Sequence, residues 1–306
     1  MQRGKAFFLV LVLLAVVSAT GICAAPVDQQ NDPQMDVGSG YFEMPEATGA
    51  NDELLRVYYY RPAAWQLDGP VLIVMHGLKR NAADYLDNWR EHAENHQVLL
   101  VCPEMSERKY PGTRYYNLGN VVDQEGAAGL LQPEEEWIFP VIDRVFGEVK
   151  QRSGALREGF ALYGHSAGAQ FVHRYLLFSR QSKAERIVAA NAGWYTMPEE
   201  TIPFPYGVAG LNLPPEQLVR AFSRPVAVLL GEKDTDPNHR LLRRTPEADR
   251  QGLYRLERGR NFFLTAQEKA NALGAPFAWK LLTVPSVGHS DTGMSQTAIR
   301  VIAGEL

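Results

Sequence analysis

One pentapeptide, Gly-His-Ser-Ala-Gly over Gly164–Gly168, constrains the fold of this chain more than any other feature. It lies between an apolar run over 160–163, typical of a strand, and a segment over 167–178 with helical periodicity. A serine on a tight strand-to-helix turn holds its hydroxyl outside the sheet, and small flanking residues let the backbone make that turn. The pentapeptide is common by chance, but at such a junction it predicts that Ser166 is a nucleophile.

Around this junction the chain alternates between predicted strands and predicted helices. We expect strands over 55–60, 71–75, 97–102, 160–163, 186–192, 225–230 and 277–284, and helices over 84–96, 133–152, 167–178, 261–273 and 292–303. Several of the strands are continuous apolar runs, as expected for strands buried on both faces. The pattern predicts an α/β fold in which helices cover both faces of a mainly parallel central sheet. Residues 41–306 are expected to form a single domain, after a flexible lead over 26–40.

The first 25 residues have the layout of a secretory signal peptide. A short basic segment over 2–5 precedes an apolar run over 6–17 and then small residues. The apolar run is shorter than the roughly 20 residues that span a bilayer, so we expect cleavage rather than an uncleaved anchor. The mature protein is then expected to be periplasmic or secreted, without stable membrane insertion.

The composition excludes several classes of protein. The 31 basic residues against 35 acidic ones argue against a nucleic-acid partner, and two cysteines are too few for a disulfide framework. Cys102 ends an apolar run and is expected to be a buried small side chain. His92 and His96 are four residues apart but lack a third ligand in a metal-binding pattern. We therefore expect neither a metal nor a cofactor.

A serine hydroxyl is a weak nucleophile unless a general base takes its proton, and that base needs an acidic residue that orients it. Both follow later in the chain: Asp234 comes directly after the predicted strand over 225–230, and His289 comes after the last predicted strand. The order serine, acid, histidine is one of the known orders of this triad. Asp236, two residues beyond Asp234, is the alternative acid.

With these motifs the chain resembles the α/β-hydrolase superfamily, and within it the secreted proteins similar to polyhydroxybutyrate depolymerases and feruloyl esterases. The resemblance covers about residues 70–306. Besides the Gly164–Gly168 turn, it rests on His76-Gly77 after a predicted strand, on the segment over 80–85, on Gly-x-x-Asp over 231–234 and on Gly-His over 288–289.

The resemblance implies roles for individual residues. Ser166 would be the nucleophile, His289 the general base and acid, and Asp234 the residue that fixes the histidine tautomer. The backbone N–H groups of Leu78 and Ala167 would form the oxyanion hole. Leu78 departs from the family pattern, in which a small residue is often found, and this leaves the width of the acyl site open.

Aromatic residues on two loops are candidates for substrate contact. Tyr115 lies in a Tyr- and Gly-rich loop, and Trp194 and Tyr195 follow a predicted strand at the edge where catalytic loops collect. They form a wall of the acyl site or anchor the loops to the core. The segment over 240–260 holds seven Arg against three acidic residues, which attracts an anionic substrate or forms a solvated surface.

The resemblance therefore implies an exported serine hydrolase that cleaves a small or polymeric carboxylic ester through an acyl-enzyme. A serine peptidase or amidase of the same fold would use the same residues and stays open. A catalytically idle binding protein is the remaining alternative, because fold alone does not dictate function.

Overall fold

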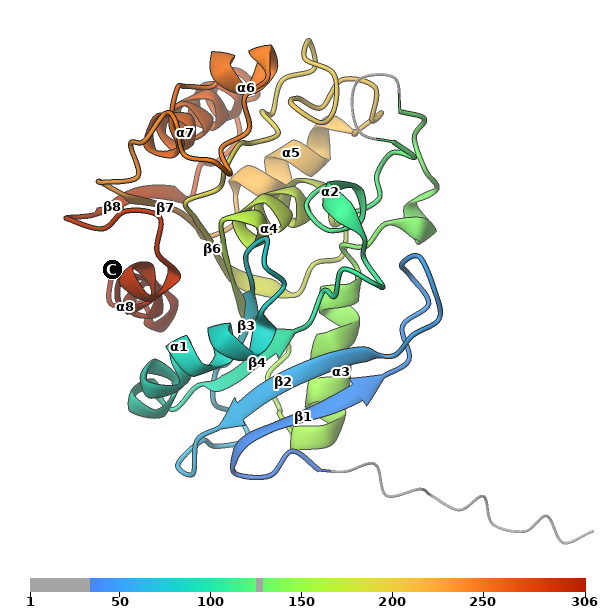
Figure 1. The fold of residues 1–306 in the computed structure, drawn as a ribbon, viewed down its shortest axis with the longest axis vertical. Coiled ribbons are helices and arrows are strands. Elements are labelled where there is room, and N and C mark those ends of the chain that lie inside the picture. Colours follow the sequence, from blue (N-terminus) through green and yellow to red (C-terminus); the bar gives the residue numbers. More distant parts are fainter. Residues whose placement is uncertain (1–33, 125–128) are drawn as a thin grey trace, which may run out of the picture. The chain divides into compact units, whose positions relative to one another are not determined.

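Apolar, mostly β-branched runs form the middle of the central sheet, as their composition predicts. The structure is a computed structural model, and it describes residues 34–124 and 129–306. Within these residues eight strands form one sheet in the order β1-β2-β4-β3-β5-β6-β7-β8 (Figure 1). The strands are β1 (Gly38–Met44), β2 (Leu55–Arg61), β3 (Val71–Met75), β4 (Leu99–Pro103), β5 (Phe160–His165), β6 (Ala184–Ala190), β7 (Val226–Gly231) and β8 (Trp279–Val284).

The pairing of the strands brings their carboxyl ends together. From β4 across to β8 every neighbouring pair is parallel, whereas β1 pairs with β2, and β2 with β4, in the antiparallel sense. The loops that follow β3, β5, β6, β7 and β8 consequently leave the sheet at the same edge, which is where ligands bind in open α/β sheets.

Helices cover both faces of the sheet (Figure 1). They are α1 (Ala82–His96), α2 (Gly112–Tyr115), α3 (Val141–Ser153), α4 (Ala167–Phe178), α5 (Pro215–Phe222), α6 (Pro246–Arg250), α7 (Arg255–Ala272) and α8 (Asp291–Ala303), with a short 3₁₀ turn η1 (Glu134–Glu136). The apolar sides of α1 and α8 share one core, and those of α3, α4, α5 and α7 share the other. The predicted α/β architecture, with a mainly parallel sheet between two helical layers, is confirmed.

The first strand begins earlier in the sequence than expected. β1 begins at Gly38, inside the segment expected as a flexible lead up to residue 40, and it pairs with β2 along its whole length. Phe42 and Met44 point into the core, and Met35 before the strand is also buried. Tyr41 and other exposed residues alternate with these apolar ones, so the strand has the period of two that marks a half-buried edge strand.

Two helices begin at other residues than expected. The helical spacing over 133–152 predicted one helix, but α3 begins only at Val141, after Pro140. Proline lacks an N–H and is disfavoured inside a helix, so the apolar residues before it pack from an irregular segment instead. α7 begins at Arg255, six residues before the expected start at residue 261, because polar and charged residues in its first turns hid the helical period.

Three further expectations concern the N-terminal segment, membrane-spanning helices and Cys102. The predicted signal peptide over 1–25 lies outside the described residues. Among the helices that the structure describes, none combines the length and the apolar character needed to cross a membrane. Cys102 is buried and unpaired in β4, as expected for a small apolar side chain.

Candidate active site

Ser166 occupies a sharp turn between β5 and α4. Its backbone has φ 58° and ψ −113°, a conformation that a residue other than glycine rarely adopts. The turn needs the two flanking glycines: a Cβ at Gly164 would collide with the backbone of Gly168, and a Cβ at Gly168 would collide with the carbonyl oxygen of Met75. The predicted strand-turn-helix is thus present, and its strain is held by close backbone packing.

The structure brings the three predicted triad residues into one chain of hydrogen bonds. His289 Nε2 lies 2.9 Å from Ser166 Oγ, and His289 Nδ1 lies 2.8 Å from Asp234 Oδ2. Asp234 is buried, and the His289 ring is only partly exposed. The alternative acid, Asp236, is exposed and accepts the N–H of Asn238 in a local turn. Of the two acids, Asp234 is the one that contacts the histidine.

Arg255 holds the other oxygen of Asp234, a role that no pattern in the sequence indicates. Its Nη1 donates to Asp234 Oδ1 at 3.2 Å, and its Nη2 lies 3.1 Å from His239 Nδ1. Both partners of this ion pair are almost fully buried. A carboxylate between a guanidinium and an imidazole is fixed in orientation and presents one oxygen to the ring.

Asn191 connects the loops that carry the acid and the histidine. It is buried directly after β6, where its Oδ1 accepts the N–H of Gly231 at 2.8 Å and its Nδ2 donates to the carbonyl of Gly288 at 3.1 Å. The two loops also contact each other, because the N–H of Lys233 donates to the carbonyl of Val287. One asparagine at a strand end carries no distinctive pattern, so the sequence alone did not indicate Asn191.

Two further histidines flank the triad and are neutral. The ring of His165 lies 4.7 Å from that of His289, between centroids, and its Nδ1 is 3.0 Å from the hydroxyl of Tyr85. Burial lowers the pKa of His165 well below its usual value. Burial also lowers the pKa of His76 to about 4, and its Nε2 accepts the N–H of Met105. These rings shape the site without adding charge to it.

The predicted oxyanion donors lie beside the nucleophile. Leu78 and Ala167 line the same cavity as Ser166. No hydrogen bond among the described residues uses the N–H of Leu78 or that of Ala167, which is the first residue of α4. The Leu78 side chain is about half exposed (46%) at the mouth of the cavity. Within the described residues, neither N–H group therefore has a competing hydrogen-bond acceptor.

The cavity has a volume of about 220 Å³ and gathers residues from several loops. Its lining consists of Leu78, Thr113, Asn117, Ser166, Ala167, Gln170, Gly193, Trp194, Arg240, Leu241, Leu242, Arg243 and Arg255.

Of the three aromatic residues expected at the substrate, only Trp194 lines this cavity. Tyr195 is fully buried instead, with its ring stacked on Phe262 at 4.4 Å between centroids. Trp194 thus borders the cavity, whereas Tyr195 lies wholly in the core. Tyr115 packs partly buried against the core, with Arg114 over its ring. The expectation that these two tyrosines contact substrate is not supported by their positions.

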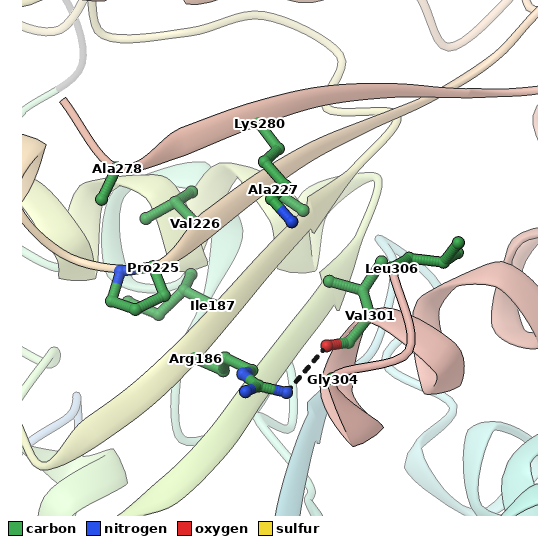
Figure 2. A pocket seen from close by; sticks show the side chains of 10 residues that line it. All are labelled: Arg186, Ile187, Pro225, Val226, Ala227, Ala278, Lys280, Val301, Gly304 and Leu306. Carbon is green, nitrogen blue, oxygen red and sulfur yellow. Dashed lines mark hydrogen bonds between the residues drawn. The ribbon is translucent and has the colours of Figure 1, made fainter.

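A second hollow, of about 210 Å³, lies at the opposite edge of the sheet (Figure 2). Residues at the amino ends of β6, β7 and β8 line it, and Arg186 there donates to the carbonyls of Val301 and Ile302 at the end of α8. None of the triad residues borders this hollow. It is structurally remote from the nucleophile.

In the described part of the chain, no group of three or more His, Cys, Asp or Glu side chains is arranged to hold a metal ion. His92 and His96, which share a helix face, make other contacts. His92 Nε2 lies 3.0 Å from Ser295 Oγ, and His96 Nδ1 lies 2.9 Å from the carbonyl of His92.

Two solved structures are similar to this chain in both sequence and fold. Poly(aspartic acid) hydrolase-1 from Sphingomonas sp. KT-1 is 40% identical with a TM-score of 0.82, over 88% of this chain and 99% of that one. LpqC, a poly(3-hydroxybutyrate) depolymerase from Bordetella parapertussis, is 34% identical with a TM-score of 0.80, over 87% of this chain and 89% of that one.

More distant structures are similar in fold alone. An S-formylglutathione hydrolase from Agrobacterium tumefaciens is 14% identical with a TM-score of 0.55, over 88% of this chain and 95% of that one. No family model matches the sequence, and no curated protein matches it.

Proposed function

Because the chain belongs to the α/β-hydrolase superfamily of serine hydrolases, with poly(aspartic acid) hydrolase-1 and LpqC among its relatives, we propose that it hydrolyses carboxylic esters through an acyl-enzyme on Ser166. The chain is a hydrolase of this fold; the ester bond and the residue roles are the proposal. One observation carries it: Ser166, His289 and Asp234 form a continuous hydrogen-bonded series beside a cavity.

In the first half of the reaction, His289 Nε2 takes the proton of Ser166 Oγ while that oxygen attacks the ester carbonyl. The carbonyl oxygen becomes an oxyanion that accepts the N–H groups of Ala167 and Leu78, each worth about 3 kcal/mol in the transition state. Asp234 stabilises the imidazolium that forms on His289. The imidazolium then gives its proton to the alcohol as the carbon–oxygen bond breaks, which leaves the acyl group on Ser166.

In the second half, water enters as the nucleophile. His289 removes its proton, the oxygen attacks the acyl carbon, and the same two N–H groups hold the second oxyanion. Collapse returns the proton to Ser166 Oγ and releases the carboxylic acid. The cycle consumes one water per ester and needs no metal or cofactor.

An amide hydrolase is the second candidate, and a specific comparison favours it. The relative with 40% identity is named for poly(aspartic acid), a polymer joined by amide bonds, whereas LpqC is named for a polyester. The same triad serves both bonds, but an amine leaves only after protonation. If the protein is an ester hydrolase, as we propose, we expect kcat/KM for an ester to exceed kcat/KM for a matched amide by more than about tenfold. A smaller preference would favour the amidase.

The proposal extends to the compartment and the partners. The basic, apolar and small-residue segments over 1–25 support export to the periplasm or the medium. The substrate is a small-molecule or polymeric ester. We expect no nucleic-acid partner, because the chain has fewer basic than acidic residues.

Labelling of the purified protein with a fluorophosphonate tests the nucleophile directly. We expect one adduct, mapped by mass spectrometry to Ser166 and lost in Ser166→Ala. Labelling at another serine would refute the assignment. No labelling, in a protein shown to be folded by circular dichroism, would favour a catalytically idle binding protein.

A further inference from the structure

The charged side chains that line the cavity beside Ser166 are all positive. Three of its lining residues are arginines, Arg240, Arg243 and Arg255, and no Asp or Glu among the described residues lines it. Arg255 is committed to Asp234, as described above. The other two arginines face the cavity from the loop that precedes α6, so the positive charge lies on the substrate side of the triad.

Most arginines of this segment have carboxylate partners, but Arg240 does not. Of the seven arginines over 240–260, Arg244 and Arg258 pair with Asp249, Arg250 pairs with Glu247, and Arg255 pairs with Asp234. Arg240 is exposed, and no residue in the described ranges forms an ion pair or hydrogen bond with it. A guanidinium at the mouth of a cavity without an internal partner is available to a ligand.

Trp194 places the second guanidinium. The guanidinium carbon of Arg243 lies 4.8 Å from the centre of the Trp194 ring, and its Nε donates to the hydroxyl of Tyr206 at 2.6 Å. Stacking on an indole and a bond through Nε fix the plane of the guanidinium. Arg243 is therefore held against the cavity wall rather than free in solvent.

A third cation lies behind that wall. Arg174 is fully buried, with its guanidinium carbon 4.3 Å from the centre of the same Trp194 ring. Its partners are the hydroxyl of Thr196 and the carbonyls of Asn117 and Gln170. No carboxylate in the described part of the chain pairs with it, and its Nη2 has no hydrogen-bond partner there. A buried charge is weakly screened, so its field reaches the cavity next to it.

From this arrangement we infer that the cavity binds a substrate with a carboxylate some distance from the scissile carbonyl, held by Arg240 and favoured by the positive charge of Arg243 and Arg174 beside Trp194. The inference rests on the proposed hydrolase function, because it deepens the substrate class of that site. Planar guanidinium groups bind carboxylates in a bidentate manner, so the subsite selects by charge and by geometry. Such a substrate is a half-ester of a dicarboxylic acid, or an acidic chain cleaved one unit at a time.

A matched pair of substrates tests the subsite. The 4-nitrophenyl half-ester of adipic acid carries the carboxylate, and its methyl ester has the same chain without the charge. For the wild-type protein at low salt we expect kcat/KM for the charged ester to exceed that for the neutral ester by about tenfold or more, mainly through KM. The ratio is expected to fall towards one as salt screens the exposed Arg240.

Two variants of equal charge change separate the subsite from the general field of the protein. Arg240→Glu is expected to lower kcat/KM for the charged ester by about tenfold or more, and to lower it for the neutral ester by a much smaller factor. Arg260→Glu, an exposed arginine of the same segment that does not line the cavity, is expected to change neither. Equal rates for both esters in the wild-type protein, or equal effects of both variants, would overturn the inference.

A binding measurement keeps this result distinct from failure of the proposed function. Calorimetry on Ser166→Ala with the two esters is expected to show tighter binding of the charged one, and loss of that difference on adding Arg240→Glu. If the wild-type protein hydrolyses neither ester and takes no fluorophosphonate, the proposed function fails while this preference still supports the subsite. Equal binding of the two esters refutes the subsite whatever the activity.

Discussion

Arg255 and Asp234 form a buried ion pair in which Nη1 donates to the carboxylate oxygen that faces away from His289. The guanidinium thus contacts the acid of the triad and not the reacting atoms, so it is a positioning residue. Since a buried carboxylate with one free oxygen can rotate or protonate, the pair keeps the other oxygen directed at the ring.

Replacing this cation should affect turnover more than substrate binding. In Arg255→Met we expect kcat to fall by about 10- to 100-fold with KM for a neutral ester almost unchanged, because a buried charge loses its partner. Arg255→Lys should recover part of the loss. Steady-state kinetics with both variants check this, and a loss confined to KM would assign Arg255 to substrate binding instead.

The two neighbouring acids should differ sharply. Asp234→Asn leaves the geometry but favours the wrong tautomer of His289, and we expect kcat to fall by about 10⁴-fold. Asp236→Asn should change kcat by less than about twofold, since Asp236 only accepts a local N–H in an exposed turn. The opposite pattern in ester hydrolysis would show that the acid was assigned to the wrong residue.

Two glycines offer a matched test of the strained turn. Gly168→Ala places a methyl group against the carbonyl oxygen of Met75, so we expect loss of folded protein or a severe loss of stability. At Gly147 in α3 a Cβ meets nothing within 4 Å, and Gly147→Ala should stabilise by up to about 1 kcal/mol. Thermal unfolding of both variants measures this. A stable Gly168→Ala protein with full activity would contradict the close packing of Gly168 against Met75.

Asp291 should make stability depend on pH in an unusual direction. Burial raises its pKa from 3.8 to about 6, although Asn88, Trp89 and Tyr163 donate hydrogen bonds to it. Between pH 4 and 6 the unfolded chain has lost this proton and the folded chain keeps it. The folded state then binds more protons, so the contribution of Asp291 to the free energy of unfolding falls as pH rises.

Comparison with Asp291→Asn isolates this effect from the buried histidines, which act in the opposite direction. We expect the free energy of unfolding of the wild type, relative to the variant, to fall by about 2 to 3 kcal/mol between pH 4 and 7. Urea unfolding at several pH values measures it. A difference that is constant with pH would mean that Asp291 is ionised in the same way in both states.

Tyr195 provides a test of the corrected cavity wall. Its hydroxyl is buried and has no hydrogen-bond partner among the residues that the structure describes. Tyr195→Phe removes a polar group without a cavity, so we expect stability to be unchanged or raised by up to about 1 kcal/mol. We also expect unchanged kcat/KM for a neutral ester. A clear rise in KM would return Tyr195 to the substrate site.

The sequence predicted those parts of the molecule that depend on local pattern. The apolar runs at β3, β4 and β7 and the turn at Ser166 were recognisable because burial on both faces and a strained junction demand particular residue types. Asp234 and His289 followed because a nucleophilic serine requires partners at strand ends. The contact of His289 with Asp234, and not with Asp236, is a property of the folded loops.

What the sequence did not predict depends on contacts between distant segments. Arg255 lay within a run of arginines, and only the fold separates the one that meets Asp234 from those that meet solvent, Asp249 or the cavity. Trp194 and Tyr195 are adjacent and both buried, but only Trp194 lines the cavity, because the segment passes along the boundary between core and cavity. β1 was missed because its alternation of apolar and polar residues was short and rich in glycine.

The bonds of Asn191 to Gly231 and Gly288 have a consequence for protein engineering. One amide side chain binds the segments after both β7 and β8, so the position of each segment depends on the other. In a chimera that takes only one of these segments from a relative, we expect Asp234 and His289 to shift relative to each other. Exchange of substrate-binding loops should therefore transfer the residue after β6 and both segments together, as one cassette.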